Sequence, residues 1–154
     1  GPAVVGNMGS KNRMDYTMMG DTVNTASRLE GVNKIYGIYT LIGDTTYHAV
    51  KNKILAREID SINVVGKKVP VTIYEPIDFI NQVNETMIQT MDFYSKGLSS
   101  YRSQNWNQAI RFFTKALEVT PEDGPSKTMI HRCQGFMENP PGKDWNGSYS
   151  MKTK

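Results

Sequence analysis

The sequence lacks several features that mark particular protein classes. Cys133 is its single cysteine among 154 residues, which excludes an internal disulfide. It has no apolar run long enough to span a bilayer and no secretory signal. The net charge of +3 is small and scattered, so no nucleic-acid partner is indicated. These absences predict a cytoplasmic protein, or the cytoplasmic part of a membrane-anchored parent.

The residue types that bind metals are also isolated from one another. His48, His131 and Cys133 do not form a zinc-ligand spacing. We expect the two histidines to be packing or surface residues and Cys133 to be a buried or half-buried helix residue. No metal ligands are therefore assigned in this chain.

Residues 20–30, GDTVNTASRLE, place two polar side chains behind a helix-start signal. Asp21 is the expected N-cap, and Asn24 and Arg28 lie four residues apart, on one face of the helix. An amide can hold a ribose oxygen, and a guanidinium offers a planar set of donors to a phosphate in a transition state. The pair thus suits a nucleotide. The alternative is an ordinary solvated helix surface.

Three segments in order, AVVGNMGS at 3–10, RMDYT at 13–17 and GDTVNTASRLE at 20–30, resemble the class III nucleotidyl cyclases, the adenylate and guanylate cyclase catalytic domain. The resemblance covers residues 1–76. It implies an α+β fold, here a truncated ferredoxin-like cyclase sheet with helices. It also implies head-to-tail pairing with a second cyclase domain, because the family's active sites are shared between two domains.

The resemblance implies roles for individual residues. Asn24 matches the asparagine that orients the ribose, and Arg28 matches the arginine that stabilises the pentacoordinate phosphorus. Thr17 falls at the position that reads the purine, and it favours ATP over GTP. Lys67 is a substitute for a phosphate-binding lysine of the family, with Lys68 as the alternative.

The resemblance also implies Mg²⁺ or Mn²⁺ in the intact enzyme, held by two aspartates. Both would precede the Asn24 helix, and this chain has no counterpart of them. Such carboxylates hold the cations that bridge the phosphates. We therefore expect a C-terminal fragment that is inactive alone. The strand ending near Val5 would lack its neighbour in such a fragment, which predicts a homodimer or larger species.

Hydrophobic patterns predict the elements of residues 1–76. Residues 6–10 form the expected turn between the first two strands, and Gly37 ends the first helix. A hairpin turn is expected at 66–68, and Pro70 favours an edge strand after it. The predicted strands are 3–5, 14–18, 39–42, 55–65 and 69–76, and the predicted helices are 21–36 and 44–51.

After residue 76 the composition predicts only helices. Residues 77–92 read as an amphipathic connector. Residues 93–138 resemble a tetratricopeptide-like helical hairpin with a cap helix from about 126 to 137, because small and large side chains fall at that repeat's positions. The tail, 139–154, is expected to be irregular, with Trp145 and Tyr149 folded back onto the helices. The positions that carry the repeat are Phe93, Gly97, Tyr101, Ala109, Phe113, Ala116 and Pro121.

Two hypotheses follow. In the first, the parent protein converts ATP to cyclic AMP and pyrophosphate, and this chain supplies the Asn24 and Arg28 half of a composite site. In the second, the chain is a non-catalytic regulatory module whose helical repeat binds a protein partner. Retention of both Asn24 and Arg28 favours the first.

Overall fold

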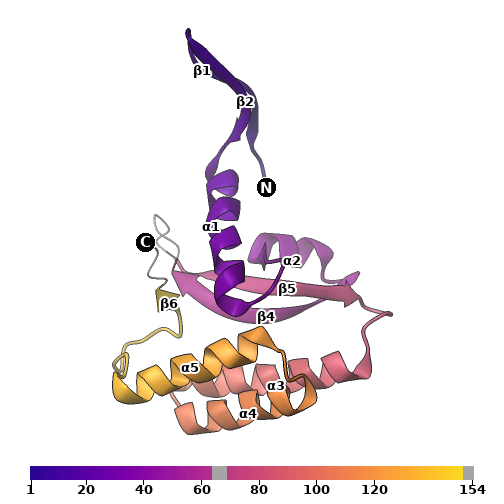
Figure 1. The fold of residues 1–154 in the computed structure, drawn as a ribbon, viewed down its shortest axis with the longest axis vertical. Coiled ribbons are helices and arrows are strands. Elements are labelled where there is room, and N and C mark those ends of the chain that lie inside the picture. The colour runs from indigo at the N-terminus through magenta and orange to yellow at the C-terminus, as the bar shows by residue number, and fades with distance from the viewer. Residues whose placement is uncertain (64–68, 151–154) are drawn as a thin grey trace.

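The computed structural model describes residues 1–63 and 69–150. Figure 1 shows a β-sheet with three helices beneath it and a long stalk rising from its other side. The predicted α+β class is confirmed. In chain order, the elements are β1 (Val4–Ser10), β2 (Arg13–Met19), α1 (Asp21–Tyr36), β3 (Ile42–Gly43), α2 (Asp44–Val50), β4 (Ile54–Asn63), β5 (Val71–Phe79), α3 (Glu85–Arg102), α4 (Trp106–Val119), α5 (Gly124–Glu138) and β6 (Tyr149–Ser150).

The outer part of the stalk is an antiparallel hairpin in which β1 pairs with β2 along its whole length, from Val4 opposite Met19 to Ser10 opposite Arg13. The predicted turn at 6–10 is therefore wrong. Residues 11 and 12 form the connecting turn. Backbone N–H and C=O groups that would be hydrated in a longer loop therefore pair with each other between the two strands. Gly9 is required near this turn, because it has a φ of 147° and a Cβ there would overlap the carbonyl oxygen of Arg13.

Helix α1 has the predicted length, and its end at Gly37 is confirmed, with a left-handed φ of 64°. Its predicted N-cap is wrong. Gly20, with a φ of 148° and no side chain to form a cap bond, occupies the cap position, and Asp21 is the first helical residue. An aspartate in the first turn still carries favourable charge at the positive end of the helix dipole. The buried residues of α1 are Leu29, Val32 and Tyr36, all in its second half.

The four-stranded sheet has the order β3-β5-β4-β6. Of the strand predicted at 39–42 only Ile42 is in β3, while Tyr39 is fully exposed. The predicted edge position of the strand after Pro70 is also wrong, because β5 lies between β3 and β4. Pro70 precedes the first residue of β5, so its missing N–H interrupts no ladder bond. The hairpin turn predicted at 66–68 lies outside the described residues.

The boundary between the sheet and the helices differs from the prediction. β5 continues to Phe79, which pairs with Ile54, and α3 begins at Glu85. Asn84 caps α3 by accepting a hydrogen bond from the backbone N–H of Met87 at 2.8 Å. The expected connector helix and the first expected helix of the repeat are therefore one element. No helix in the described ranges is long and apolar enough to cross a membrane.

One hydrophobic core joins the sheet to the helices. It contains Ile59 and Ile73 from the sheet, Tyr36 from α1, and Tyr94 and Phe113 from α3 and α4. Cys133 is buried in the same core, as expected, and burial raises the pKa of its thiol to about 12. The helical region thus shares its core with the cyclase-like residues.

The tail returns to the body of the protein, as predicted for Trp145 and Tyr149. The indole of Trp145 joins Tyr101, Trp106 and Phe136, with ring centroids 5.1 to 5.6 Å away. An irregular tail was expected, yet Tyr149 and Ser150 form β6, which pairs in parallel with β4. Burial of aromatic surface accounts for this return, since exposed aromatic groups in a tail are costly.

The α3–α4 contact provides a test of packing. A Cβ on Gly97 would lie 2.6 Å from the ring of Phe113. Gly97→Ala is therefore expected to cost about 1–3 kcal/mol by overpacking, more than the roughly 1 kcal/mol gained in helix propensity. The midpoint of urea unfolding should fall. Gly135→Ala in α5 is the control: nothing lies within 4 Å of its Cβ position, so that variant should be more stable than wild type. Equal stabilisation by both substitutions would contradict the predicted steric overlap between a side chain at position 97 and the ring of Phe113.

Candidate functional site

Helix α1 carries the two residues with predicted catalytic roles. Asn24 and Arg28 are both exposed, and their spacing places them about one turn apart. None of residues 21–28 is buried, so this half of α1 stands out from the body of the protein (Figure 1). An exposed amide and guanidinium on one face are accessible to a ligand or to a second protein chain.

Thr17, the predicted purine-reading residue, lies in β2, exposed and opposite Gly6 in the hairpin. The hairpin extends away from the N-terminal end of α1 (Figure 1). Thr17, Asn24 and Arg28 are therefore spread along one stalk, and among the described residues none of the three lines either of the two best clefts. Lys67 and Lys68, the predicted phosphate ligands, lie outside the described residues.

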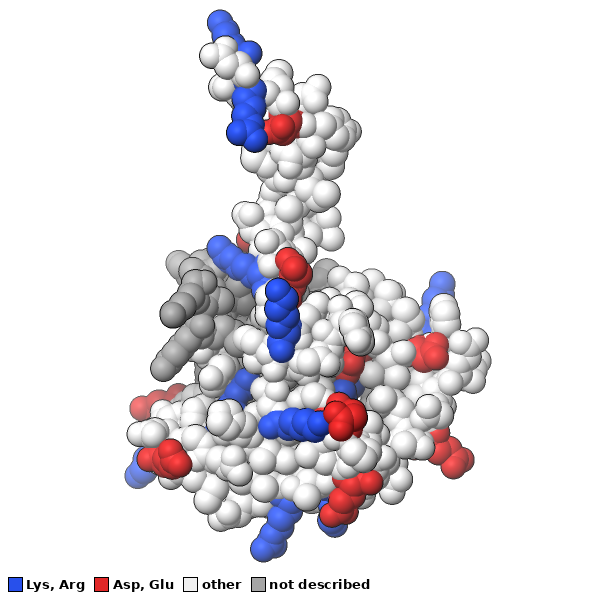
Figure 2. Space-filling model, viewed as in Figure 1, with Lys and Arg blue, Asp and Glu red and all other residues white. Residues whose placement is uncertain are grey.

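Apolar side chains cover much of the stalk. Six of them are between 56% and 75% exposed. In Figure 2 the stalk is largely uncharged, with cationic side chains toward its far end. A surface of this kind indicates contact with another protein surface. The six residues are Val4, Val5, Met14, Tyr16, Met18 and Met19.

A cleft of about 770 Å³ lies beside α1, on a face that excludes Asn24 and Arg28. Leu29 and Asn33 of α1 form one wall, and Leu41, Asp44 and Thr72 are among the residues opposite. Within the part of the chain that the structure describes, the buried side-chain oxygen of Asn33 has no hydrogen-bond partner, while its amide donates to the carbonyl of Tyr39 at 3.1 Å. Sequence analysis missed this cleft because its walls come from segments far apart in the chain.

The family resemblance implies a metal held by two aspartates. Within residues 1–63 and 69–150, no group of three histidine, cysteine, aspartate or glutamate side chains could hold a metal ion.

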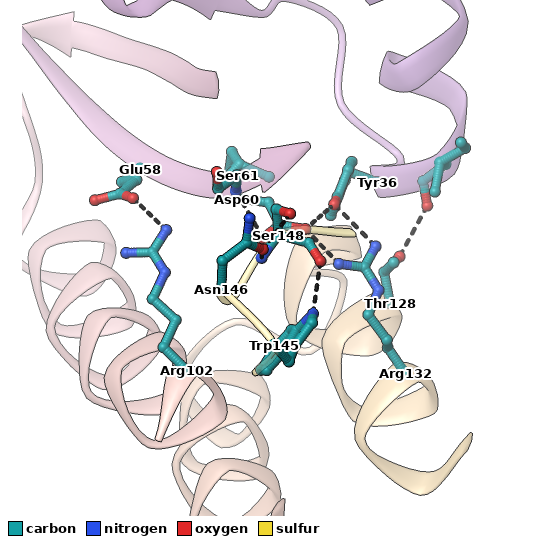
Figure 3. A network of polar contacts seen from close by, with 12 residues as sticks. Tyr36, Glu58, Asp60, Ser61, Arg102, Thr128, Arg132, Trp145, Asn146 and Ser148 are labelled. Carbon is teal, nitrogen blue, oxygen red and sulfur yellow. Dashed lines mark hydrogen bonds and ion pairs between the residues drawn. The ribbon is translucent and has the colours of Figure 1, made fainter. Parts of the chain in front are cut away.

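Two buried arginines form the main polar structure between the sheet and α5. Arg132 of α5 pairs with Asp60 of β4 and donates to the Tyr36 hydroxyl at 2.9 Å. That hydroxyl donates to Asp60 at 2.6 Å. Figure 3 shows the three side chains converging from α1, β4 and α5. We call Tyr36, Asp60 and Arg132 the Tyr36 cluster.

The electrostatics of the Tyr36 cluster favour a charged arginine and a neutral tyrosine. Burial, and then the charge of Asp60, raises the pKa of Tyr36. Burial is the largest single effect and would lower the pKa of Arg132, but the combined effects of Asp60, Tyr36 and Tyr101 outweigh it and the net shift is upward. The ring of Tyr149 lies 3.6 Å from the Arg132 guanidinium and covers it.

The second buried arginine joins the same elements. Arg57 of β4 contacts Glu75 of β5 at 2.5 Å and Asp123 at 2.8 Å. The other oxygen of Asp123 accepts from the backbone N–H of Ser126 at 3.0 Å and so caps α5. Sequence analysis missed both arginines. Their partners lie 18 to 96 residues away in the chain, and no local spacing marks such pairs.

Comparison with known proteins relates this chain to adenylate cyclases. The terminal-differentiation-specific adenylate cyclase of Dictyostelium discoideum is 34% identical over 137 residues, which cover 86% of this chain and 6% of that protein. Adenylate cyclase 1 of Rhizobium meliloti is 42% identical over 86 residues, or 56% of this chain and 13% of that protein. Homology to adenylate cyclases therefore covers much of the chain.

The Dictyostelium match is long enough to extend past residues 1–76 into α3–α5. The chain spans only 6% and 13% of the lengths of these two relatives. Among solved structures, the adenylyl cyclase CyaB from P. aeruginosa is 38% identical over 53% of this chain and 41% of that chain, with a TM-score of 0.43. No family model matches the chain.

Proposed function

We propose that this chain is part of an adenylate cyclase that forms cyclic AMP and pyrophosphate from ATP. In this reaction the 3′-hydroxyl of ATP attacks the α-phosphorus, its proton leaves, and pyrophosphate is the leaving group. Asn24 orients the ribose, and Arg28 donates to the α-phosphate as negative charge develops on it. Thr17 contacts the adenine. Lys67 is a phosphate ligand in the same proposal.

The exposed positions of Asn24 and Arg28 on α1 carry this proposal. They lie on one face of a helix whose sequence resembles the cyclase motif, in a chain homologous to adenylate cyclases. A planar guanidinium suits a phosphate oxygen because it can donate two parallel hydrogen bonds. Donors fixed in place before the reaction stabilise transition-state charge without reorganising.

A second cyclase domain completes the site in this proposal. Among the described residues, Thr17, Asn24 and Arg28 lie along the stalk outside the two best clefts, which supports a pocket closed by a partner surface. The apolar stalk supports such a partner, because its side chains are more than half exposed. The partner is a second copy or a related cyclase domain, and it would cover β1, β2 and the exposed face of α1.

The partner or another part of the parent protein would also supply the aspartates that hold Mg²⁺ or Mn²⁺. Those cations would neutralise the phosphates and favour loss of the 3′-hydroxyl proton. We accordingly expect this chain to form no cyclic AMP alone. The proposed location is the cytoplasm, with or without a membrane-anchored parent.

The proposed organisation has a truncated ferredoxin-like cyclase unit at 1–76, a connector at 77–92, a tetratricopeptide-like unit at 93–138 and a tail at 139–154. The fit of Gly97 against Phe113 supports this kind of helical hairpin for α3 and α4, with α5 as the cap. A protein partner at these helices is a second proposed function. Exposed Ile88 and Met137 on α3 and α5 favour it.

The test is a complementation assay with the full chain. It is mixed with a cyclase domain that retains its two metal aspartates but has its own asparagine and arginine replaced, and cyclic AMP is measured from ATP with Mn²⁺. We expect product only in the mixture, and none from either component alone. Association of the two chains without product would overturn the proposed catalytic role and leave the protein-binding role. GTP in place of ATP tests the role of Thr17.

A further inference from the structure

The helical region is joined to one end of the helix that carries Asn24 and Arg28. Buried residues of α1 occur only in its second half, and the last of them, Tyr36, has no solvent exposure. No residue of the N-terminal half is buried, and Asn24 and Arg28 are exposed. Helix α1 is thus held at its C-terminal end, while its proposed functional residues lie toward the other end.

The contacts at that end come from α5 and β4. Arg132 donates to the Tyr36 hydroxyl, which donates to Asp60. One turn earlier on α5, the Thr128 hydroxyl donates a hydrogen bond to the backbone carbonyl oxygen of Ile35 at 2.8 Å. Figure 3 draws this bond as the dashed line that starts at the labelled Thr128. This bond satisfies one of the carbonyls that a helix leaves without an internal partner at its C-terminus.

Backbone contact completes the attachment. A Cβ on Gly124, the first residue of α5, would overlap the carbonyl oxygen of Tyr36 and lie 3.2 Å from the Cα of Gly37. The start of α5 therefore approaches the end of α1 more closely than any residue with a side chain would allow. Side-chain and backbone contacts together fix the orientation of α1 relative to α5.

We propose that the Tyr36 cluster, with Thr128, orients α1 and so lets the helical region set the positions of Asn24 and Arg28. Tyr36, Asp60, Thr128 and Arg132 are positioning residues in this inference, which rests on the proposed function. Arg28 is eight residues from Tyr36, about 12 Å along the helix, so a tilt of about 5° moves it about 1 Å. Displacements of that size at a reacting centre cost up to about 100-fold in rate.

The first experiment measures orientation without activity. Spin labels are placed on exposed positions of α1 and α4 by Ser27→Cys and Gln108→Cys in the full chain, and the distance distribution is recorded by double electron–electron resonance. Buried Cys133, whose thiol pKa is raised to about 12, stays unlabelled under native conditions. The distribution is then compared between wild type and Tyr36→Phe, which keeps the ring and removes the hydroxyl.

We expect Tyr36→Phe to shift or broaden the label distances by about 2 Å, the displacement that a tilt of about 10° produces at Ser27. Arg102→Met is the matched control. It breaks the 2.5 Å contact between Arg102 of α3 and Glu58 of β4 without touching α1, so it should leave the distances unchanged. Thr128→Val is a milder second variant that should act in the direction of Tyr36→Phe.

The second experiment repeats the complementation assay. Because Arg28 acts on the transition state, Tyr36→Phe should lower kcat about tenfold or more while KM for ATP stays within about twofold. Arg102→Met should change neither. Unchanged label distances in Tyr36→Phe and Thr128→Val would overturn the inference, and so would altered distances with an unaltered kcat. An inactive wild-type mixture would instead defeat the proposed function, and the distances would still decide whether the Tyr36 cluster orients α1.

Discussion

Arg28→Ala is expected to lower kcat of the complemented cyclase by about 100- to 1,000-fold, the usual effect of removing one donor from a transition-state site. KM for ATP should change little, because the developing charge on the phosphate exists only in the transition state. The measurement is steady-state cyclic AMP formation in the mixture described above. The melting temperature of the variant should match that of wild type, since Arg28 is an exposed residue.

Two companion variants make the Arg28 result specific. Arg28→Lys keeps the positive charge but loses the planar fork of donors, so its kcat should lie between those of wild type and Arg28→Ala. Lys34→Ala removes an exposed cation from the same helix and should leave kcat unchanged. Retention of more than about a third of wild-type kcat by Arg28→Ala would contradict the proposed role, because a transition-state donor is worth far more.

Arg57→Met is expected to reduce the free energy of unfolding by roughly 3–5 kcal/mol, the usual cost of removing one partner from a buried ion pair. The Arg57 side chain is only 4% exposed and contacts both Glu75 and Asp123, so its loss leaves two carboxylates in a buried site without their cation. Asp123 also caps α5, so the loss of Arg57 should destabilise the start of this helix as well as the sheet. Urea unfolding followed by circular dichroism measures the change.

Arg102→Met is again the matched control. The Arg102–Glu58 pair also joins a helix to β4, but its side chains are about one third exposed, so its loss should cost no more than about 1 kcal/mol. A similar cost for both arginines would show that the buried Arg57 pair is not a main connection between the sheet and α5.

Both buried arginines serve the same junction. Arg57 reaches the start of α5, and Arg132 comes from its middle and reaches the end of α1. The aromatic ring of Tyr149, from the returning tail, covers Arg132. Attachment of the helical region to the sheet therefore combines apolar burial with paired charges. These pairs fix the relative positions of the elements, because a buried charge without its partner is strongly unfavourable.

Local patterns in the sequence predicted the elements that depend on near neighbours. Helix α1, its end at Gly37, the burial of Cys133 and a helical region after the sheet all follow from periodicity, capping residues and composition. The relation to adenylate cyclases was also readable from the order of motifs in residues 3–30. Each of these signals lies within a short stretch of chain, where side-chain spacing by itself carries the information.

Strand predictions were wrong where the pairing of strands decides the structure. The turn was expected at 6–10 because its glycines resemble a loop, yet pairing with β2 keeps those residues extended. β5 was expected at an edge, but β3 covers it, and β6 arises only because the tail reaches β4. A strand's position in a sheet depends on which other strands bury its backbone groups, and local composition does not contain that.

The sequence by itself determined that Asn24 and Arg28 share one helix face and that the chain resembles the cyclases, because helical spacing and motif order are local properties. Only the tertiary structure decided that this helix is held at Tyr36 by β4 and α5, through partners 24 and 96 residues away in the chain. Burial forces such polar groups to find one another wherever they lie in the sequence, since leaving them unpaired away from water would cost several kilocalories per mole.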